Sequence, residues 1–176
     1  MEQYRTMKKR ALLAGFAALL TSPALAQSWT DYRNEDGNFH IEMPGTPKLN
    51  PVQIPIGNNE TAPMTEALVR APGAAYQVSY IVYPPRIAGL ASADVILDTF
   101  RNNMSAGHGY RNETKLTLGR FSGREFTVTE SSTRHTAVRL YWIRGKLYQL
   151  MATGAPGIEA KPDTRKFFDS FGLIKT

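Results

Sequence analysis

The strongest constraint on the fold is that turn residues separate many short strand-like segments along the chain. Residues 39–43 (Phe-His-Ile-Glu-Met) alternate apolar and polar side chains, which is the pattern of a strand with one face on a core. Residues 76–83 are rich in aromatic and β-branched types, as in a central strand. The same reasoning predicts strands at residues 29–33, 64–71, 113–121, 124–131, 136–143 and 146–153. Residues 48–63, rich in Pro, Gly and Asn, are expected to form an irregular crossing or edge segment.

In two segments the apolar residues have the spacing of an α-helix instead of the alternation of a strand. Ser92 is a suitable N-cap for a helix that ends at Gly107 or Gly109, and Pro162-Asp163 is a typical helix start. Each helix has one apolar stripe, formed by Ile96, Phe100 and Met104 in the first and by Phe167, Phe171 and Ile174 in the second. We therefore expect an α+β domain, with a mainly antiparallel β-sheet of about six to seven strands flanked by two α-helices.

The first 26 residues have the three-part layout of a secretory signal. A basic region at residues 8–10 precedes an apolar run at 11–20, and Ala24-Leu25-Ala26 places small residues before Gln27. The apolar run is too short for a membrane span, which takes roughly 20 residues. We expect cleavage near Ala26/Gln27, a single domain over residues 27–176, a periplasmic or secreted location, and no membrane span after cleavage.

Removal of this signal changes the charge of the chain. Residues 27–176 carry 17 basic and 14 acidic side chains, a net charge of +3 instead of the +6 of the full chain. Nucleic-acid binding usually needs a concentrated basic surface, so no nucleic-acid partner is expected. The chain has no cysteine, which excludes disulfides, thiolate metal ligands and a thiol nucleophile. The domain must therefore be held together by core burial.

Two stretches carry a resemblance to known proteins. Residues 39–47 (FHIEMPGTP) are close to an F-x-[IV]-x-[MF]-P-G-x-P pattern, and residues 166–171 (KFFDSF) end in Phe-Phe-x-Ser-Phe. Residues 123–126 (GREF) and the hairpin at 139–150 lie between them. This combination resembles small exported or membrane-tethered bacterial domains of unknown function, whose order of elements is similar to that of the PsbP-like fold, named for an extrinsic subunit of photosystem II. The resemblance implies an accessory or partner-binding role rather than an enzyme, and it brings no catalytic residue with it.

The sequence has no recognisable catalytic or metal-binding motif. His40, His108 and His135 are isolated from one another, and none lies in an H-x-x-x-H or H-E-x-x-H pattern. His40 and Glu42 share a strand face, but alternation already explains them as a solvent-facing polar pair. Residues 119–123 (GRFSG) differ from the G-x-S-x-G nucleophile elbow. We predict no catalytic residues, no metal and no cofactor.

The candidate binding surface is the hairpin at residues 134–148, where cations alternate with aromatic side chains. Such interleaving is able to bind sugars, anionic polymers or nucleic acid through stacking and charge. Strand alternation predicts that Arg139, Tyr141 and Ile143 face outward and that Val138, Leu140 and Trp142 face inward. The predicted binding residues are Arg134, His135, Arg139, Tyr141, Arg144 and Lys146.

Taken together, these features predict an exported, non-enzymatic binding or accessory module of the bacterial cell envelope, which recognises a protein partner or an envelope polymer. Two alternatives stay open. One is an unrecognised envelope hydrolase, which needs a histidine and an acid to converge in a pocket. The other is a small apolar-ligand carrier, which needs a cavity between sheet and helix.

Overall fold

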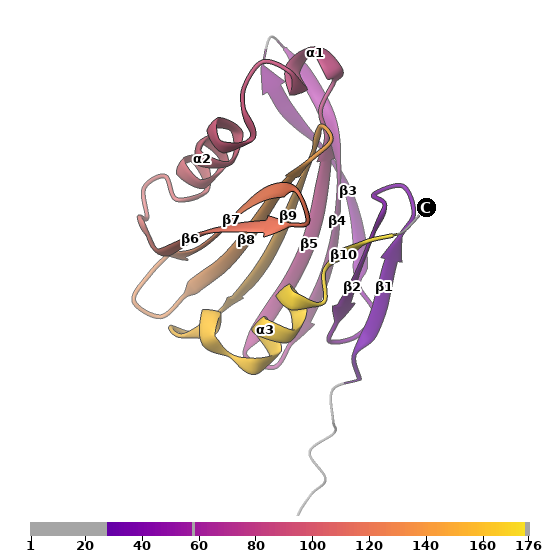
Figure 1. The fold of residues 1–176 in the computed structure, drawn as a ribbon. Helices are drawn as coiled ribbons and strands as arrows, with labels where there is room; N and C mark the ends of the chain where they lie inside the picture. Colours follow the sequence, from indigo (N-terminus) through magenta and orange to yellow (C-terminus); the bar gives the residue numbers. More distant parts are fainter. Residues whose placement is uncertain (1–27, 58, 175–176) are drawn as a thin grey trace, which may run out of the picture.

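The structure is a computed structural model that describes residues 28–57 and 59–174 (Figure 1). The predicted secretory signal, residues 1–26, lies outside the described residues. None of the described helices is long and apolar enough to cross a membrane.

Strands dominate the described chain. The strands are β1 (Thr30–Asn34), β2 (Phe39–Met43), β3 (Lys48–Gly57), β4 (Glu60–Ala71), β5 (Ala74–Val82), β6 (Tyr110–Leu118), β7 (Phe121–Thr129), β8 (His135–Ile143), β9 (Lys146–Gly154) and β10 (Gly172–Leu173). The helices are the single turn α1 (Pro85–Ala88), α2 (Ala93–Met104), the 3₁₀ turn η1 (Ile158–Ala160) and α3 (Pro162–Asp169).

The strands form two sheets. The large sheet has seven strands in the order β3-β4-β5-β9-β8-β7-β6, and the small one has three in the order β1-β2-β10. All pairings are antiparallel. The chain leaves β5, passes through α1 and α2 to the far edge, and returns through the meander β6–β9, so that β9 pairs with β5. The predicted α+β class, with its mainly antiparallel sheet and two main helices, is confirmed.

Each face of the large sheet has its own hydrophobic core. On one face, the small sheet, η1 and α3 pack against the side chains of Tyr76, Val78 and Tyr148, and Figure 1 shows α3 in yellow near the indigo strands. On the other face, α2 places Leu97 against Phe126, Val138 and Leu140. The inner strand β8 is therefore buried on both faces.

The predicted elements mostly exist, with shifted bounds. The apolar stripe predicted for the second helix was wrong in part, because α3 ends at Asp169 and Phe171 and Ile174 lie beyond it. Ser92 caps α2 by accepting a hydrogen bond from the Val95 amide, and α3 begins at Pro162 as expected. Phe39, Ile41 and Met43 point into the core as predicted, whereas His40 and Glu42 are partly exposed.

The prediction of irregular structure at residues 48–63 was wrong in part. These residues form β3 and the start of β4, a long antiparallel hairpin. The prolines at 51 and 55 are tolerated because β3 is an edge strand of the large sheet, where half of the backbone amides need no partner. An edge position was one of the two options that the sequence predicted for this segment.

The turn between β6 and β7 lies at Gly119-Arg120, about three residues before the predicted one. Gly119 has φ +58°, a left-handed conformation that suits glycine. Gly123, which looked like the turn residue, lies inside β7, where a Cβ would come within 2.7 Å of the Leu140 carbonyl oxygen and the Tyr141 ring. Glycine is therefore needed there for close strand packing.

Candidate functional site

The predicted outward face of β8 is not a surface. Arg139 is 8% exposed and Tyr141 is 4% exposed, and Ile143 is also buried. The prediction was wrong because η1, α3 and the small sheet cover this face, so both faces of β8 lie against a packed layer. Val138 and Leu140 are buried as predicted, under α2.

Arg139 and Tyr141 have structural partners on this covered face. The Arg139 guanidinium donates hydrogen bonds to Glu125 (2.8 Å), to Asp169 (3.0 Å) and to the carbonyl oxygen of Phe168 (3.0 Å). The Tyr141 ring stacks on Phe171 with centroids 5.5 Å apart, and burial raises the pKa of its hydroxyl. These contacts attach the C-terminal helix to the sheet.

The other four predicted binding residues are separated from one another. Buried His135 lies 2.9 Å from an Arg111 nitrogen, and Arg134 is exposed and paired with Glu130 at 2.8 Å. Exposed Arg144 and half-buried Lys146 lie at the opposite end of the hairpin, around the turn at residues 144–145. The structure therefore does not unite the six residues in one surface.

The three histidines lie on different elements. His40 is on β2 beside Asp31 (3.7 Å), His108 follows α2, and His135 begins β8. Among the residues that the structure describes, no hydrogen bond or ion pair joins two of them, and no group of three His, Asp or Glu side chains is placed to hold a metal ion. His40 and Asp31 form a histidine–acid pair on the small sheet, and His108 and Glu130 line one hollow of the large sheet, so the hydrolase alternative stays a prediction.

An open trough crosses the face of the large sheet on which α2 lies, in the part of that face that α2 does not cover. Because α2 packs mainly on β7 and β8, the rows of side chains on β4, β5 and β9 stay partly open. Two adjoining hollows of about 140 and 250 Å³, which share Met151, make up this trough. The first is lined by Leu68, Arg70, Ala75, Gln77, Arg134, Met151 and Thr153, and the second by Met104, His108, Val128, Glu130, Thr136, Val138 and Met151.

Strand register explains the shape of this sheet trough. Arg70, Ala75 and Thr153 lie opposite one another on β4, β5 and β9, so a small side chain stands between two longer ones. In the next row, Gln77 lies between Leu68 and Met151. A small residue at the centre of a row lowers the floor of the sheet and leaves a groove that runs across the strands.

The charge of the trough is uneven. Arg70 is exposed, and no ion pair to it is found within residues 28–57 and 59–174. Arg134, which lines the same hollow, is paired with Glu130. The guanidinium of Arg70 is thus available for an anionic group at this end. Of the predicted binding residues, only Arg134 belongs to the trough; Arg70 and Gln77 were missed, although Gln77 was visible as a polar residue in an apolar strand.

A separate hollow is an apolar cleft between α2 and the end of the sheet. It has a volume of about 130 Å³. Tyr83, Phe100 and Trp142 form its aromatic wall, with ring centroids 5.6 Å apart for Tyr83–Trp142 and 6.1 Å apart for Tyr83–Phe100. Val95 and Ala91 are exposed at its rim. Burial raises the pKa of Tyr83 to about 12, so its hydroxyl stays neutral.

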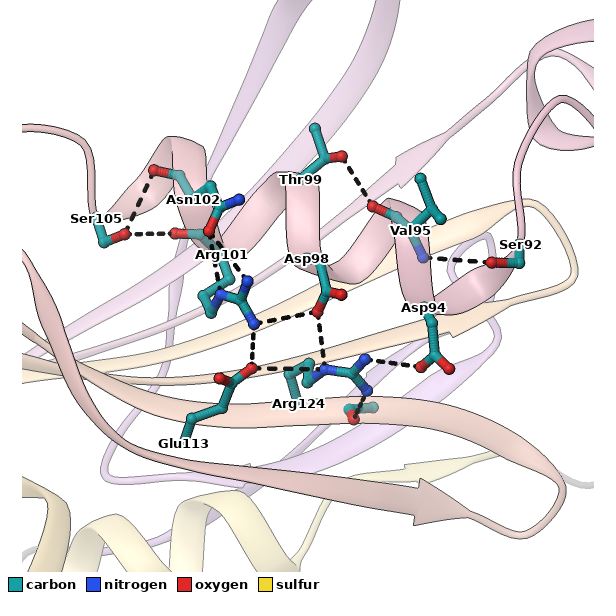
Figure 2. Close-up of polar contacts among 11 residues, drawn as sticks. Ser92, Asp94, Val95, Asp98, Thr99, Arg101, Asn102, Ser105, Glu113 and Arg124 are labelled. Carbon is teal, nitrogen blue, oxygen red and sulfur yellow. Dashed lines mark hydrogen bonds and ion pairs between the residues drawn. The ribbon is translucent and has the colours of Figure 1, made fainter.

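A buried arginine holds α2 on the sheet. Residues of α2 in turn form one wall of the apolar cleft and contribute Met104 to the trough. Arg124 on β7 is 1% exposed and donates hydrogen bonds to Asp94 (2.7 Å), Asp98 (3.1 Å) and the Gly123 carbonyl (3.1 Å) (Figure 2). Asp94 and Asp98 are four residues apart and therefore share one helix face. The hydrogen bond from Arg124 holds the pKa of Asp94 below its ordinary value.

Arg101 extends this network along α2. It donates a hydrogen bond to Asp98 at 3.1 Å and pairs with Glu113 on β6. Glu113 also lies 3.6 Å from Arg124. Figure 2 shows the two guanidinium groups and the three carboxylates in alternation between helix and sheet. Such alternation satisfies a buried cation that would be costly alone.

The arrangement of strands and helices is matched by a known structure. The solution structure of cyanobacterial PsbP (CyanoP) from Synechocystis sp. PCC 6803 superposes with a TM-score of 0.52 at 16% sequence identity, over 86% of this chain and 96% of that one. The chain has the PsbP-like fold. The resemblance noted from residues 39–47 and 166–171 is thereby confirmed at the level of the fold.

At this identity the PsbP-like fold says nothing about the role of the trough or the cleft. A Pseudomonas aeruginosa protein of unknown function, PA94, also matches, with a TM-score of 0.39 at 13% identity, over 75% of this chain and 86% of that one. No protein-family model and no curated protein matches the sequence.

Proposed function

We propose that this protein is an exported, non-enzymatic binding module of the cell envelope and that the sheet trough receives a protein partner. The observation that carries the proposal is the pair of open side-chain rows that hold Arg70, Gln77 and Met151, on the face of the sheet opposite to the one that the small sheet and α3 cover. An envelope polymer is the other partner that the sequence leaves open. The N-terminal pattern of residues 8–26 supports export.

The chemistry of the trough favours a peptide segment with an acidic group. Met104 and Met151 offer flexible, polarisable surface that adapts to apolar side chains. Gln77 donates one hydrogen bond to Glu66 and Thr153 shares one with Thr136, so the amide oxygen and the second N–H of Gln77 remain for a partner backbone. Arg70 offers a guanidinium that carboxylates bind in bidentate fashion.

We expect a photo-reactive amino acid at position 77, in the chain beginning at Gln27, to cross-link a reproducible partner from envelope extract. Arg70→Glu lowers the yield about tenfold, because a hydrogen bond to a charged group contributes roughly 1.5–3 kcal/mol. Arg120→Glu, an exposed arginine on the β6–β7 turn, is the matched control and leaves the yield unchanged. Equal yields from Arg70→Glu and Arg120→Glu, or equal labelling from exposed position 117 on β6, contradict the proposal.

The apolar cleft supports a second candidate function, the carriage of a small apolar ligand. Its volume of about 130 Å³ is close to the roughly 150 Å³ of a protein cavity that binds benzene. The aromatic wall of Tyr83, Phe100 and Trp142 favours a flat ring, which packs edge-to-face or offset against other rings.

Toluene tests this candidate. In a Trp29→Phe background, Trp142 is the only tryptophan, and we expect toluene to change its emission in a saturable way. Ala91→Phe fills the mouth of the cleft and abolishes the change, whereas Ala106→Phe, exposed beyond α2, does not. A linear response, or one that survives Ala91→Phe, excludes a carrier site here.

A further inference from the structure

The two edges of the large sheet differ in their ability to accept another strand. Strand β3 forms one edge and β6 forms the other (Figure 1). Pro51 and Pro55 lie on β3, and a proline within a sheet is tolerated only where its missing amide would point away from the neighbouring strand. An added strand would therefore find two outward amides of β3 missing. Strand β6 contains no proline, so its outward amides are all able to donate.

Strand β6 has a straight segment whose outer side is uncovered. Residues 114–118 pair with β7 without a shift in register, and the bulge lies before them, between Arg111 and Thr114. Within residues 28–57 and 59–174, β7 is the sole strand that pairs with β6, and α2 packs mainly on β7 and β8. The backbone of this segment therefore presents unbonded groups along the edge, which form a template for another strand.

The β6–β7 turn determines which backbone groups point outward. The two strands are joined by two residues, so Leu118 and Phe121 form a hydrogen-bonded pair. In an antiparallel ladder, every second residue of a strand bonds to the same neighbour. Thr114 and Leu116 therefore also bond to β7. The amides and carbonyls of Lys115 and Thr117 point away from β7, and an added strand would bind these groups.

Two leucines approach this edge on the α3 face of the sheet. Leu116 lies opposite Gly123, and Leu118 lies opposite Phe121. Both leucines are only partly buried, against the core beneath the small sheet and α3. A strand added beside β6 would cover more of their apolar surface, which favours association.

The other face of the segment carries Lys115 and Thr117, both exposed. Lysine on an edge strand normally opposes edge pairing. Here the lysine is close to Asp94 of α2, whose pKa is lowered first by Arg124 and then by Lys115. The charge of Lys115 is thus partly balanced within its own chain. What it still opposes is another cation directly across the edge.

We propose that two copies of this chain pair through β6, antiparallel and about a two-fold axis at Leu116. This register uses all five residues of the straight segment. Leu116 lies opposite Leu116 of the partner subunit, and Thr114 lies opposite Leu118 of the partner subunit, so the leucines cover one another. Each Lys115 lies opposite Thr117 of the partner subunit, so like charges do not meet.

The other two-fold registers are less favourable. An axis at Lys115 places the two lysines directly opposite each other, which is destabilising. An axis at Thr117 pairs only the last residues before the turn. An axis at Thr114 brings the bulge between Arg111 and Thr114 into the new ladder, where it disrupts pairing. The axis at Leu116 is therefore the register that the side chains and the bulge select.

The edge prolines limit this assembly to two copies. Pairing through β6 uses the open edge of each large sheet and leaves the β3 edges, with Pro51 and Pro55, at the two ends of the joined sheet. An isologous two-fold contact closes in this way, whereas a sheet with two open edges would add copies without limit. This self-association goes beyond the proposed partner binding, because it uses the sheet edge and not the trough.

We expect the chain beginning at Gln27 to show a monomer–dimer equilibrium with a dissociation constant of about 100 μM, because two five-residue edges form a contact far smaller than a standard interface. Sedimentation velocity at concentrations on both sides of this value measures it. Spectra of the ¹⁵N-labelled chain at the same concentrations show which amides change, and we expect those of residues 114–118.

Charge variants at position 117 test the register. Thr117→Glu places a carboxylate opposite Lys115 of the partner subunit, and we expect it to tighten the dimer about fivefold, whereas Thr117→Lys weakens it about fivefold. Gln53→Glu and Gln53→Lys, at an exposed position of β3, are the matched controls. They change the net charge equally and leave the dissociation constant unchanged.

Thr117→Pro removes an outward amide and keeps the hydrogen bonds to β7, so we expect it to abolish the dimer, whereas Gln53→Pro on the β3 edge does not. Thermal unfolding shows whether Thr117→Pro still folds, and the charge variants give an independent reading if it does not. A photo-reactive amino acid at position 117 joins two copies into a product of twice the chain mass, which is distinct from a partner captured at position 77.

The proposal is overturned if the chain stays monomeric about tenfold above the expected dissociation constant. It is also overturned if Thr117→Glu and Thr117→Lys act in the same direction, or if the concentration-dependent amides lie outside β6. Capture of a different protein at position 117, with no product of twice the chain mass, would assign the edge to another partner.

Discussion

Phe39→Ala is expected to lower the free energy of unfolding by about 3–5 kcal/mol, the usual cost of removing a buried phenylalanine. Phe39 is 1% exposed and its ring lies 5.6–6.0 Å from four others. These rings belong to Tyr32 in the small sheet, Tyr80 and Tyr148 in the large sheet, and Phe171 after α3. Phe39 thus connects three parts of the fold. Urea unfolding followed by circular dichroism measures the loss.

The control for Phe39→Ala is Leu49→Ala. Leu49 is on the edge strand β3 and is 58% exposed, so its truncation changes stability by less than about 0.5 kcal/mol. A loss under about 1 kcal/mol for Phe39→Ala would mean that the small sheet is not part of the cooperative core.

The second large effect concerns the network beneath α2. Asp98→Asn with Glu113→Gln removes two of the three carboxylates that neutralise Arg124 and both carboxylates that pair with Arg101. We expect this double variant to lose about 3 kcal/mol, because it leaves Arg124 buried with only Asp94 as counter-charge. Urea unfolding and amide hydrogen exchange in α2 both report the loss.

Arg124→Met is expected to be less destabilising than the double variant. It removes the buried cation and fills its place with an unbranched apolar side chain, while Arg101 still pairs with Asp98 and Glu113. We expect a loss of about 1 kcal/mol, smaller than that of the double variant, since apolar replacement of a buried charge is often tolerated. If Arg124→Met proves the more damaging of the two, the network contributes net stability beyond the neutralisation of one charge.

Two groups of ion pairs, one around Arg124 and one around Arg139, lie on opposite faces of the large sheet. Arg124 attaches α2 on one face, and Arg139 attaches α3 on the other, each through carboxylates on its helix. These residues are on adjacent strands, and Arg139 also pairs with Glu125, the neighbour of Arg124 in β7. The helices α2 and α3 are thus positioned from the same two strands.

Local pattern predicted the elements well, because strand alternation, the Ser92 cap and Pro162 act over a few residues. The shifted β6–β7 turn shows the limit of such patterns. Gly119 and Gly123 both suit a turn, and only the close approach of Tyr141 decides which of them lies inside the strand. The early part of β4 was missed because prolines on the paired edge strand obscured the hairpin.

The candidate site was less predictable than the fold. The exposed-face interpretation of Arg139 and Tyr141 assumed that one side of β8 meets solvent. The nearly unbroken run of apolar residues around them was the available sign of burial on both faces. The trough could not be read from the sequence, since Arg70, Ala75 and Thr153 come together only through the pairings of β4, β5 and β9.

By itself, the sequence determined most of the strand and helix segments and the α+β class, and it carried the resemblance to a PsbP-like fold, because periodicity and turn chemistry are local properties. Only the tertiary structure decided which strand faces are open. The return of β9 to β5 and the docking of α3 and α2 on opposite faces are contacts between distant residues. Burial depends on those contacts, and so does the location of every hollow in which a ligand is able to bind.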